Sequence, residues 1–367
     1  MKNKKIIITG GTGFIGQALV KYLGNENEII ILSRQQGDPH NNAYHSKLLT
    51  RKDGYKVQYL KWDGCHVDNN WLKAIDRSDI LLNLAGKSVN CRYHKKQKNE
   101  ILSSRVNATK TIGEAIRKCN HPPQLWINGG STTIYRNEYE GPNDEFTGMI
   151  SDQKKDNMPF NFLDTAREIK NRILTRVQHG KNSSVYKELD YDFSVQVCKL
   201  WEKTFEKEQT AATRKVILRT AITLDEGGVL TPYLRLCKYF LGGKQGSGKQ
   251  MFSWVHAEDI ARMIEWLFEN KTAEGVYNCV APYAVSNTDL MYTLRNITHN
   301  KIGLPAPELL LEAGAFLIGT ETELLLKSRW VIPAKARKEG FRFKYETIGQ
   351  ACQAIIGKLP RSAYRLL

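Results

Sequence analysis

The sequence predicts an α/β fold, a doubly wound parallel sheet followed by a smaller, mainly helical C-terminal region. The first observation is the N-terminal pattern, in which Ile6, Ile7 and Ile8 precede closely spaced glycines and an amphipathic run. This pattern is typical of a buried strand, a tight turn and a helix. The second observation is that strand and helix patterns alternate up to about residue 226. Such alternation indicates a parallel sheet with helices on its faces.

The expected elements follow one another in a regular order. A helix begins at Phe14, and a second strand covers Glu28–Ser33. The remaining elements are strands at residues 57–63, 79–85, 124–128 and 215–224, and helices at residues 95–118 and 194–205.

The character of the chain changes twice. Residues 139–189 are polar and rich in Lys, Asn and Asp, which indicates a surface insertion with one helix at about residues 163–177. Beyond residue 227 helical patterns dominate, with one short strand expected at residues 341–345. We therefore expect a dinucleotide-binding domain, residues 1–226, and a substrate-side region, residues 227–367, that is mixed with the last elements of the sheet domain.

A glycine-rich segment, residues 242–248, has a spacing similar to that of the loop that binds phosphates in nucleoside triphosphatases. Gln250 stands where such a loop needs a Ser or Thr to bind Mg²⁺, and no buried strand leads into the segment. We interpret it as a flexible flap over a cofactor or substrate, or as a plain surface loop.

The glycines after the first strand have the spacing of a dinucleotide-binding turn. A phosphate can approach the backbone only where no Cβ intervenes. The helix that begins at Phe14 also directs free N–H groups and its positive end towards that anion. The residues expected to bind the cofactor here are Gly10, Thr12, Gly13, Phe14, Ile15 and Gly16.

The end of the second strand indicates which nucleotide binds. An NAD site usually has an Asp or Glu at this point, which binds the ribose 2′-hydroxyl. This chain has Ser33 and Arg34 instead. A guanidinium can form charge-assisted hydrogen bonds to a 2′-phosphate and lie against the adenine. We therefore expect NADP(H) in preference to NAD(H).

Composition narrows the class of protein further. No apolar stretch approaches the roughly 20 residues that a spanning helix needs. Seven Cys without regular spacing fit a reducing compartment, so we expect a cytoplasmic protein with neither disulfides nor a metal site. The net charge of +16 makes nucleic acid a candidate partner, because proteins that bind nucleic acid are often strongly basic. Because the basic residues are spread rather than clustered with aromatic side chains, we expect a small-molecule substrate and no nucleic acid or membrane.

Several segments together resemble the extended short-chain dehydrogenase/reductases, and among them the atypical YfcH-like epimerase branch. The N-terminal turn alone is generic, and the C-terminal motifs make the resemblance specific. The segments are Thr9 to Gly16, Asn83-Leu84-Ala85-Gly86, Ser104-Arg105-x-Asn107, Leu218-Arg219-Thr220, residues 242–250, Trp254-Val255-His256-x-x-Asp259, Val331-Ile332-Pro333 and Gly340-Phe341-x-Phe343.

This resemblance implies further contacts with the cofactor. It implies that Asp63 contacts the adenine, and that Leu84, Ala85 and Gly86 line the ribose. It also places Thr223 near the cofactor and implies a part in NADP binding for Glu100 and Arg105. Spacing alone would predict that Glu100 and Arg105 are solvated charges on a helix.

One family feature is missing. Short-chain reductases use a Tyr-x-x-x-Lys pair, in which the lysine lowers the pKa of the tyrosine that exchanges a proton. None of the 16 Tyr here has a Lys four positions later. Aligned on Trp201-Glu202, the Tyr position holds Ser194 and the Lys position holds Cys198. The accompanying serine is retained as Ser131.

Two functions therefore remain open. The first is an NADP-dependent oxidoreductase or epimerase, a monomer or homodimer, that acts on a hydroxyl- or carbonyl-bearing small molecule such as a nucleotide-sugar-like compound. In that case Ser131 polarises the substrate oxygen, and Tyr135, Cys198, Lys199 or water transfers the proton. The alternative is an NADP(H)-binding sensor or partner-binding protein without turnover.

Overall fold

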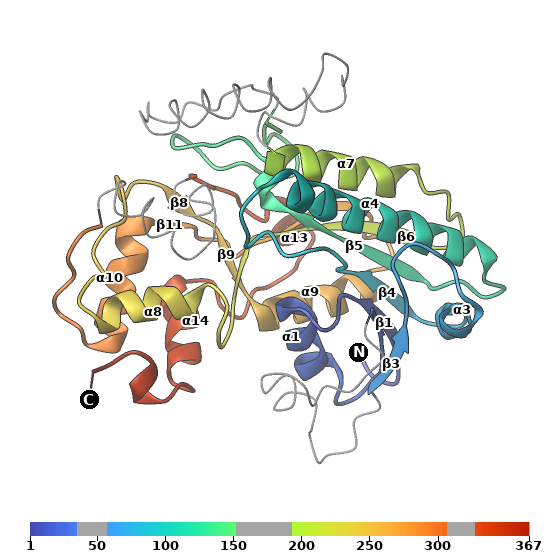
Figure 1. Ribbon diagram of the computed structural model, residues 1–367, viewed down its shortest axis with the longest axis horizontal. Helices are drawn as coiled ribbons and strands as arrows, with labels where there is room; N and C mark the ends of the chain where they lie inside the picture. Colours follow the sequence, from blue (N-terminus) through green and yellow to red (C-terminus); the bar gives the residue numbers. More distant parts are fainter. Residues whose placement is uncertain (35–56, 152–192, 307–326, 367) are drawn as a thin grey trace.

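The computed structural model describes residues 1–34, 57–151, 193–306 and 327–366. A parallel sheet of seven strands lies at the centre, in the order β10-β6-β5-β4-β1-β2-β3 (Figure 1). The chain order reverses between β1 and β4, as in a doubly wound sheet, so the predicted fold class is confirmed. The strands are β1 (Lys5–Thr9), β2 (Glu28–Ser33), β3 (Val57–Lys61), β4 (Ile80–Asn83), β5 (Leu125–Ser131), β6 (Arg214–Thr220) and β10 (Gly275–Cys279).

Helices cover both faces of the sheet. The helices α1 (Phe14–Leu23) and α9 (Ala257–Glu269) lie on one face, and α4 (Lys95–Lys118) and α7 (Phe193–Lys207) lie on the other (Figure 1). Successive side chains of a strand point to opposite faces. Accordingly Ile6 and Ile8 pack in the core with α1 and α9, whereas Ile7 packs in the core with α4 and α7. The run of three Ile is therefore a strand buried on both faces.

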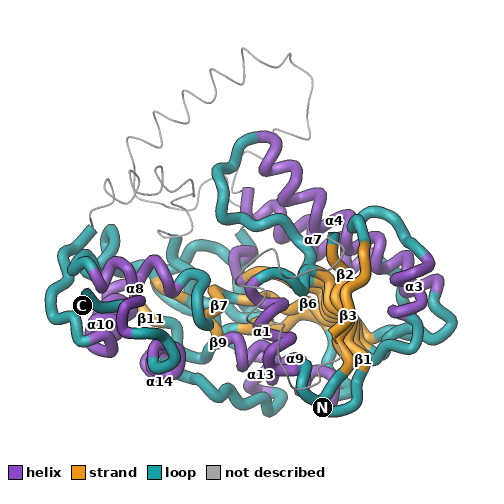
Figure 2. Tube along the Cα trace, turned by 60° about the horizontal axis from the view of Figure 1, so that its bottom comes forward, coloured by secondary structure: helices purple, strands orange, loops and turns teal. Residues whose placement is uncertain are grey.

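The C-terminal region forms a second apolar cluster beside the sheet. It contains α8 (Leu230–Lys238), α10 (Asn287–Thr298) and α14 (Ile348–Ile356), at the other end of the molecule from α3 (Asn69–Ile75) (Figure 2). Its strands form two small sheets, one of β7 (Ile222–Leu224) with β9 (Trp254–His256), the other of β8 (Met251–Phe252) with β11 (Val285–Ser286). The short helices are α13 (Ala334–Lys338), η2 (Thr132–Ile134) and η3 (Arg361–Ala363). Because α9 and β10 also follow residue 226, both predicted regions contribute to the main fold.

Two predicted strands differ from the structure. Residues 341–345 form no strand, because the backbone N–H groups of Lys344 and Tyr345 donate to the Asp259 carboxylate at 2.7 and 2.9 Å. The strand expected at residues 215–224 is broken at Ala221, whose N–H donates to Cys279 O. After this break β7 leaves the main sheet and pairs with β9. The helix expected at residues 163–177 lies outside the described residues.

The glycine-rich segment is packed and does not fit a free flap. Gln245 and Gln250 are buried, and Gln250 Nε2 donates to Gln245 O at 2.9 Å. Asn287, at the start of α10, accepts from Gln245 N at 2.8 Å. These bonds fix residues 242–250 against α10.

Of the helices in the described ranges, none is long and apolar enough to cross a membrane.

Candidate functional site

The turn between β1 and α1 requires glycine at two positions for its own geometry. Gly10 has φ +68°, and a Cβ there would lie 2.6 Å from the carbonyl oxygen of Leu84. A Cβ at Gly16 would lie 2.5 Å from the Cα of Gly11. The turn therefore packs directly on the end of β4 and on the first turn of its own helix, and neither position has room for a side chain.

Gly13 is different, because its surroundings inside the protein leave space. It is the N-cap of α1 with φ −79°, and a Cβ there would meet only Gly10 O, at 3.2 Å. Thr12 and Gly13 are exposed, while Phe14 and Ile15 are half-buried. Among the described residues no side chain caps this end of α1, and its first turn has no acidic residue. The N–H groups at the start of a helix have no partner within the helix, so this end can bind an anion.

Buried amide and hydroxyl groups fix the neighbouring strand ends. The Thr9 hydroxyl donates to Asn83 Oδ1 at 2.7 Å, and Asn83 Nδ2 donates to Asn128 Oδ1 at 2.7 Å and to Thr109 Oγ1 at 3.1 Å. These four side chains join β1, β4, β5 and α4. They hold the turn that carries Leu84, Ala85 and Gly86, which is partly exposed beside the glycine turn.

The ends of β2 and β3 lie on the other side of β1. Arg34 is exposed directly after β2, and it makes no ion pair within the described ranges. Ser33 O accepts from Trp62 N at 2.9 Å, which brings the neighbouring Asp63 close to this end. The His66 side chain and the N–H groups of Cys65 and His66 lower the pKa of Asp63 to about 2. Asp63 therefore stays ionised, and its carboxylate accepts hydrogen bonds from residues of its own turn.

Glu100 forms an ion pair at the surface. Its carboxylate pairs with Lys87, which follows the Gly86 turn. The bond from Lys87 lowers the pKa of Glu100, with smaller contributions from the charges of Lys96 and Arg34. Because 40% of its side chain is exposed, Glu100 is a solvated helix charge, as its spacing predicts.

Arg105, in contrast, is not a solvated charge. Its guanidinium lies so close to Gly86 that a Cβ there would be 2.9 Å from Arg105 Cζ. Nη1 donates to Lys87 O at 3.1 Å and Ile101 O at 2.9 Å, and Cζ lies 5.2 Å from the centre of the Trp201 ring. Burial lowers the pKa of this guanidinium. A desolvated cation therefore faces the turn expected to line the ribose.

The catalytic candidates lie at the end of β5 and on α7. Ser131 is partly exposed, and its Oγ donates to Thr133 Oγ1 at 3.0 Å and accepts from Thr133 N at 3.2 Å. Ser194 is half-buried in the first turn of α7, and Lys199 is also half-buried. Cys198 is buried three residues before Trp201, whose ring centre lies 5.2 Å from Arg105 Cζ. The Lys position of the family motif is thus about one helical turn from the residue on which Arg105 stacks.

Tyr135 belongs to a buried network that no local sequence pattern predicts. The side chain is 1% exposed, and its hydroxyl donates to Asn278 Oδ1 at 3.0 Å and accepts from Arg219 Nη1 at 2.8 Å. Arg219 also forms two bonds to the Glu202 carboxylate, at 2.9 and 2.7 Å. Burial raises the pKa of the Tyr135 phenol. The Tyr135 hydroxyl is therefore already hydrogen-bonded within the protein. This geometry does not favour the expected proton transfer to or from a substrate.

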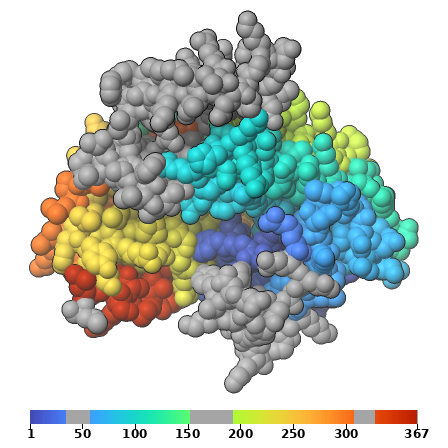
Figure 3. All heavy atoms as spheres, viewed as in Figure 1, coloured from blue at the N-terminus to red at the C-terminus, as the bar shows by residue number. Residues whose placement is uncertain are grey.

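The C-terminal region closes one side of the glycine turn. Thr223 is buried on β7, in register with Val255 of β9. The loop after β7 brings Gly228 so close to Phe14 that a Cβ would lie 2.8 Å from the ring. Figure 3 shows the same junction, where the dark blue N-terminal residues reach the surface between the yellow and cyan segments.

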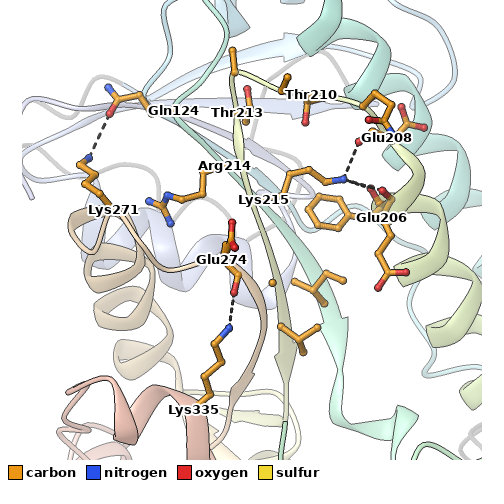
Figure 4. A pocket seen from close by; sticks show the side chains of 17 residues that line it. Gln124, Glu206, Glu208, Thr210, Thr213, Arg214, Lys215, Lys271, Glu274 and Lys335 are labelled. Carbon is orange, nitrogen blue, oxygen red and sulfur yellow. Dashed lines mark hydrogen bonds between the residues drawn. The ribbon is translucent and has the colours of Figure 1, made fainter. Parts of the chain in front are cut away.

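A hollow of about 1030 Å³ lies at the opposite, amino-terminal edge of the sheet (Figure 4). Most of its cations bind backbone carbonyls, and Lys271 binds the side chain of Gln124. Lys215 donates to the oxygens of Phe205 and Glu208 at 2.7 and 2.8 Å, and Lys335 donates to Glu274 O at 2.5 Å. Ligands of doubly wound sheets bind at the carboxyl ends of the strands. We therefore place the functional site at the Gly13 edge and not in this hollow.

Comparison with known families agrees with this geometry. Residues 6–160 match the NAD dependent epimerase/dehydratase family, and residues 306–355 match a domain of unknown function, DUF1731. The N-terminal part of the chain, residues 6–160, is therefore similar to the NAD dependent epimerase/dehydratase family. An epimerase family protein of Staphylococcus saprophyticus is 28% identical over 355 residues, which are 96% of this chain and 99% of that protein. The resemblance to epimerase family proteins that the motifs predicted is confirmed.

Solved structures share the fold of this chain. The human epimerase family protein SDR39U1 (isoform 2), solved with NADPH, has a TM-score of 0.71 and 23% identity, and the match covers 96% of this chain and 99% of that one. The UDP-N-acetylglucosamine 4-epimerase from Methanobrevibacter ruminantium, solved with UDP-N-acetylmuramic acid, has a TM-score of 0.63 and 16% identity, and the match covers 97% and 98%. At these identities the likeness concerns the fold alone.

Proposed function

We propose that this protein is an NADP(H)-dependent oxidoreductase or epimerase that acts on a hydroxyl- or carbonyl-bearing small molecule. The observation that carries the proposal is the open approach to Gly13, where the described residues provide no side-chain cap for the N–H groups of α1 and no acidic residue in its first turn. Two cations flank this approach, Arg34 beyond β2 and Arg105 beside the end of β4. A dinucleotide carries negative charge that such groups bind.

Different residues at the carboxyl edge of the sheet bind different parts of the cofactor. The N–H groups at the start of α1 hold the pyrophosphate, and Arg34 holds the 2′-phosphate. When bound, the nicotinamide supplies hydride transfer. The Ser131 hydroxyl polarises the substrate oxygen, since it is partly exposed at the carboxyl end of β5. The structural neighbour solved with NADPH supports NADP(H) as the cofactor. The neighbour solved with a nucleotide sugar supports a nucleotide sugar as the substrate.

One observation favours a second candidate, an NADP(H)-binding sensor without turnover. Ser194 and Cys198 replace the proton-transferring pair, and the Tyr135 hydroxyl is used by Asn278 and Arg219. Oxidation of NADPH across a panel of carbonyl compounds and nucleotide sugars separates the two candidates. Turnover of any substrate supports the enzyme, whereas NADPH binding with no turnover of the panel supports the sensor.

Arg34 is expected to decide the choice between the two nicotinamide cofactors. In the unaltered protein NADPH should bind at least about tenfold more tightly than NADH, because one charge-assisted contact contributes about 1.5 to 3 kcal/mol. In Arg34→Asp this preference should vanish, while NADH affinity should change little. Fluorescence titration with both cofactors measures it. Equal affinities in the unaltered protein, or a preference for NADPH that persists in Arg34→Asp, would exclude the 2′-phosphate role.

Ser131 is expected to matter more for turnover than Ser194. Ser131→Ala removes a hydrogen bond to the reacting oxygen, and loss of one such donor typically lowers kcat about 10²-fold to 10³-fold. Ser194→Ala should leave activity within about tenfold, because an unassisted hydroxyl is too weak an acid to replace general catalysis. Steady-state NADPH oxidation by both variants gives the comparison. A large loss in Ser194→Ala with Ser131→Ala unaffected would reverse the assignment.

A further inference from the structure

We propose that one end of the molecule docks on an anionic lipid surface without crossing it. This end is formed by three segments, residues 235–244, 295–306 and 360–366, which we call the basic end. They carry an excess of positive charge and expose large apolar side chains. Lipid binding at the basic end is independent of cofactor binding at the Gly13 edge.

The fold brings the three segments together, although they lie far apart in the sequence. The carbonyl oxygen of Phe240 accepts from Leu304 N at 2.8 Å, which joins the first segment to the second. Lys238 Nζ donates to Ser362 O at 2.8 Å, which joins the first segment to the third. Figures 1 and 3 show the yellow, orange and red parts of the chain side by side at this end of the molecule.

The positive charge of the basic end is not neutralised within it. Its three segments contain seven Lys and Arg and no Asp or Glu. The half-buried cations donate to backbone carbonyl oxygens at 2.8 to 2.9 Å, and they are Lys238, Arg295 and Arg365. The exposed cations are Arg235, Lys244, Lys301 and Arg361. Within the described ranges none of the seven forms an ion pair, so their charge is available to an anionic partner.

The basic end also exposes a patch of large apolar side chains. Their exposed fractions lie between 40 and 59%, and they are Tyr239, Phe240, Leu241, Ile302 and Leu304. The first three are consecutive, and the hydrogen bond from Leu304 N to Phe240 O places the second segment beside them. A contiguous apolar patch on a folded protein typically marks a binding surface.

The backbone at Phe240 is unfavourable for the residue that it carries. Phe240 N donates to Cys237 O at 3.1 Å, and Leu241 N donates to Leu236 O at 2.9 Å. This pattern ends α8 at a position where glycine is common, and Phe240 there has φ +61°. A left-handed conformation is costly for a bulky side chain. The chain thus has an exposed aromatic ring where glycine would be more stable, which favours a role for the ring outside the fold.

An anionic membrane fits both properties of the basic end. Lys and Arg are attracted to anionic headgroups, while aromatic and aliphatic side chains enter the boundary with the acyl chains. Nucleic acid would contact the cations but would leave the aliphatic side chains of Leu241, Ile302 and Leu304 without a partner. The sequence alone predicted no membrane partner, because the basic residues are spread along the chain and only the fold gathers these seven.

Flotation of the full chain with lipid vesicles tests the proposal. One set of vesicles contains phosphatidylcholine alone, and the other contains about one-third phosphatidylserine. We expect binding to the anionic vesicles, at least about tenfold weaker binding to phosphatidylcholine alone, and release by salt.

Two variants of the basic end separate its apolar and charged contributions. Phe240→Gly removes the ring and relieves the backbone, so the thermal unfolding temperature should stay equal or rise while vesicle binding falls about tenfold. The double variant Lys244→Glu/Lys301→Glu reverses two exposed charges and should weaken vesicle binding at least about a hundredfold.

Matched controls make the same changes on α4 and α7, away from the basic end. Leu200→Ser removes an apolar side chain that is 38% exposed. Lys110→Glu/Lys203→Glu reverses two exposed charges. Both should leave vesicle binding within about twofold, because screening limits the reach of a surface charge.

Three results would overturn the proposal. The first is no binding to the anionic vesicles, or binding that Phe240→Gly leaves unchanged. The second is a dimer of the lipid-free protein in analytical ultracentrifugation that Phe240→Gly dissociates, since the patch would then belong to a second copy of the chain. The third is tight binding of a single-stranded oligonucleotide that depends on Lys244 and Lys301 but not on Phe240, together with weaker binding to vesicles.

Discussion

Replacing Gly13 with valine is expected to abolish the binding of NADPH and NADH while the fold remains intact. The backbone of Gly13, with φ −79° and ψ 173°, is one that a β-branched residue adopts readily. Within the described residues an added Cβ meets only the Gly10 carbonyl oxygen, at 3.2 Å, and we expect the two methyl groups beyond it to occupy the space that the pyrophosphate needs. Calorimetric titration measures the loss, and circular dichroism with thermal unfolding measures the fold.

Two other glycines provide the controls for this variant. Gly16→Val should damage the fold itself, because a Cβ there would collide with the Cα of Gly11 at 2.5 Å. Gly141→Val should affect neither fold nor binding, because nothing lies within 4 Å of its Cβ position. If Gly13→Val bound NADPH as tightly as the unaltered protein, the phosphates would have to lie elsewhere.

Arg219→Met is expected to be among the most destabilising substitutions in the chain. It removes three hydrogen bonds and leaves the Glu202 carboxylate buried without its partner. Breaking a buried ion pair from one side typically lowers the free energy of unfolding by about 3 to 5 kcal/mol. Chemical denaturation followed by tryptophan fluorescence gives the free energy of unfolding.

The double variant Arg219→Met/Glu202→Leu isolates the cause of this loss. With both charges replaced by apolar side chains no buried carboxylate remains, so most of the lost stability should return. A double variant as unstable as Arg219→Met would mean that packing around Tyr135, rather than the orphaned charge, determines the effect. The pair matters to the site because Arg219 precedes Thr220, which lies in register with Ser131.

Local patterns predicted the parts of the fold that local geometry decides. The glycine spacing located the turn and the start of α1 at Phe14, and helical periodicity located α4 at Lys95–Lys118. The Ser33-Arg34 pair could be placed at a strand end because strand and turn follow each other along the chain. These features depend on neighbouring residues, whose side chains determine the backbone conformation directly.

Contacts between distant segments could not be predicted in this way. Arg105 has the helical spacing of a solvated charge, and only the packing of α4 against α7 and the Gly86 turn desolvates it. The strand expected at residues 341–345 fails because the Asp259 carboxylate, more than 80 positions away in the sequence, takes its backbone donors. The ion pair between Arg219 and Glu202 likewise joins β6 to α7, and no local sequence pattern predicts it.

A crystal structure of the protein soaked with NADPH tests the central claim most directly. We expect the pyrophosphate at the N–H groups beside Gly13, the 2′-phosphate on Arg34 and the nicotinamide half on the β4 side of the sheet, next to Gly86. NADPH density at the opposite edge, in the hollow lined by Arg214, Lys271 and Lys335, would contradict the assignment of the site. So would a structure in which the phosphates bind with no contact to the start of α1.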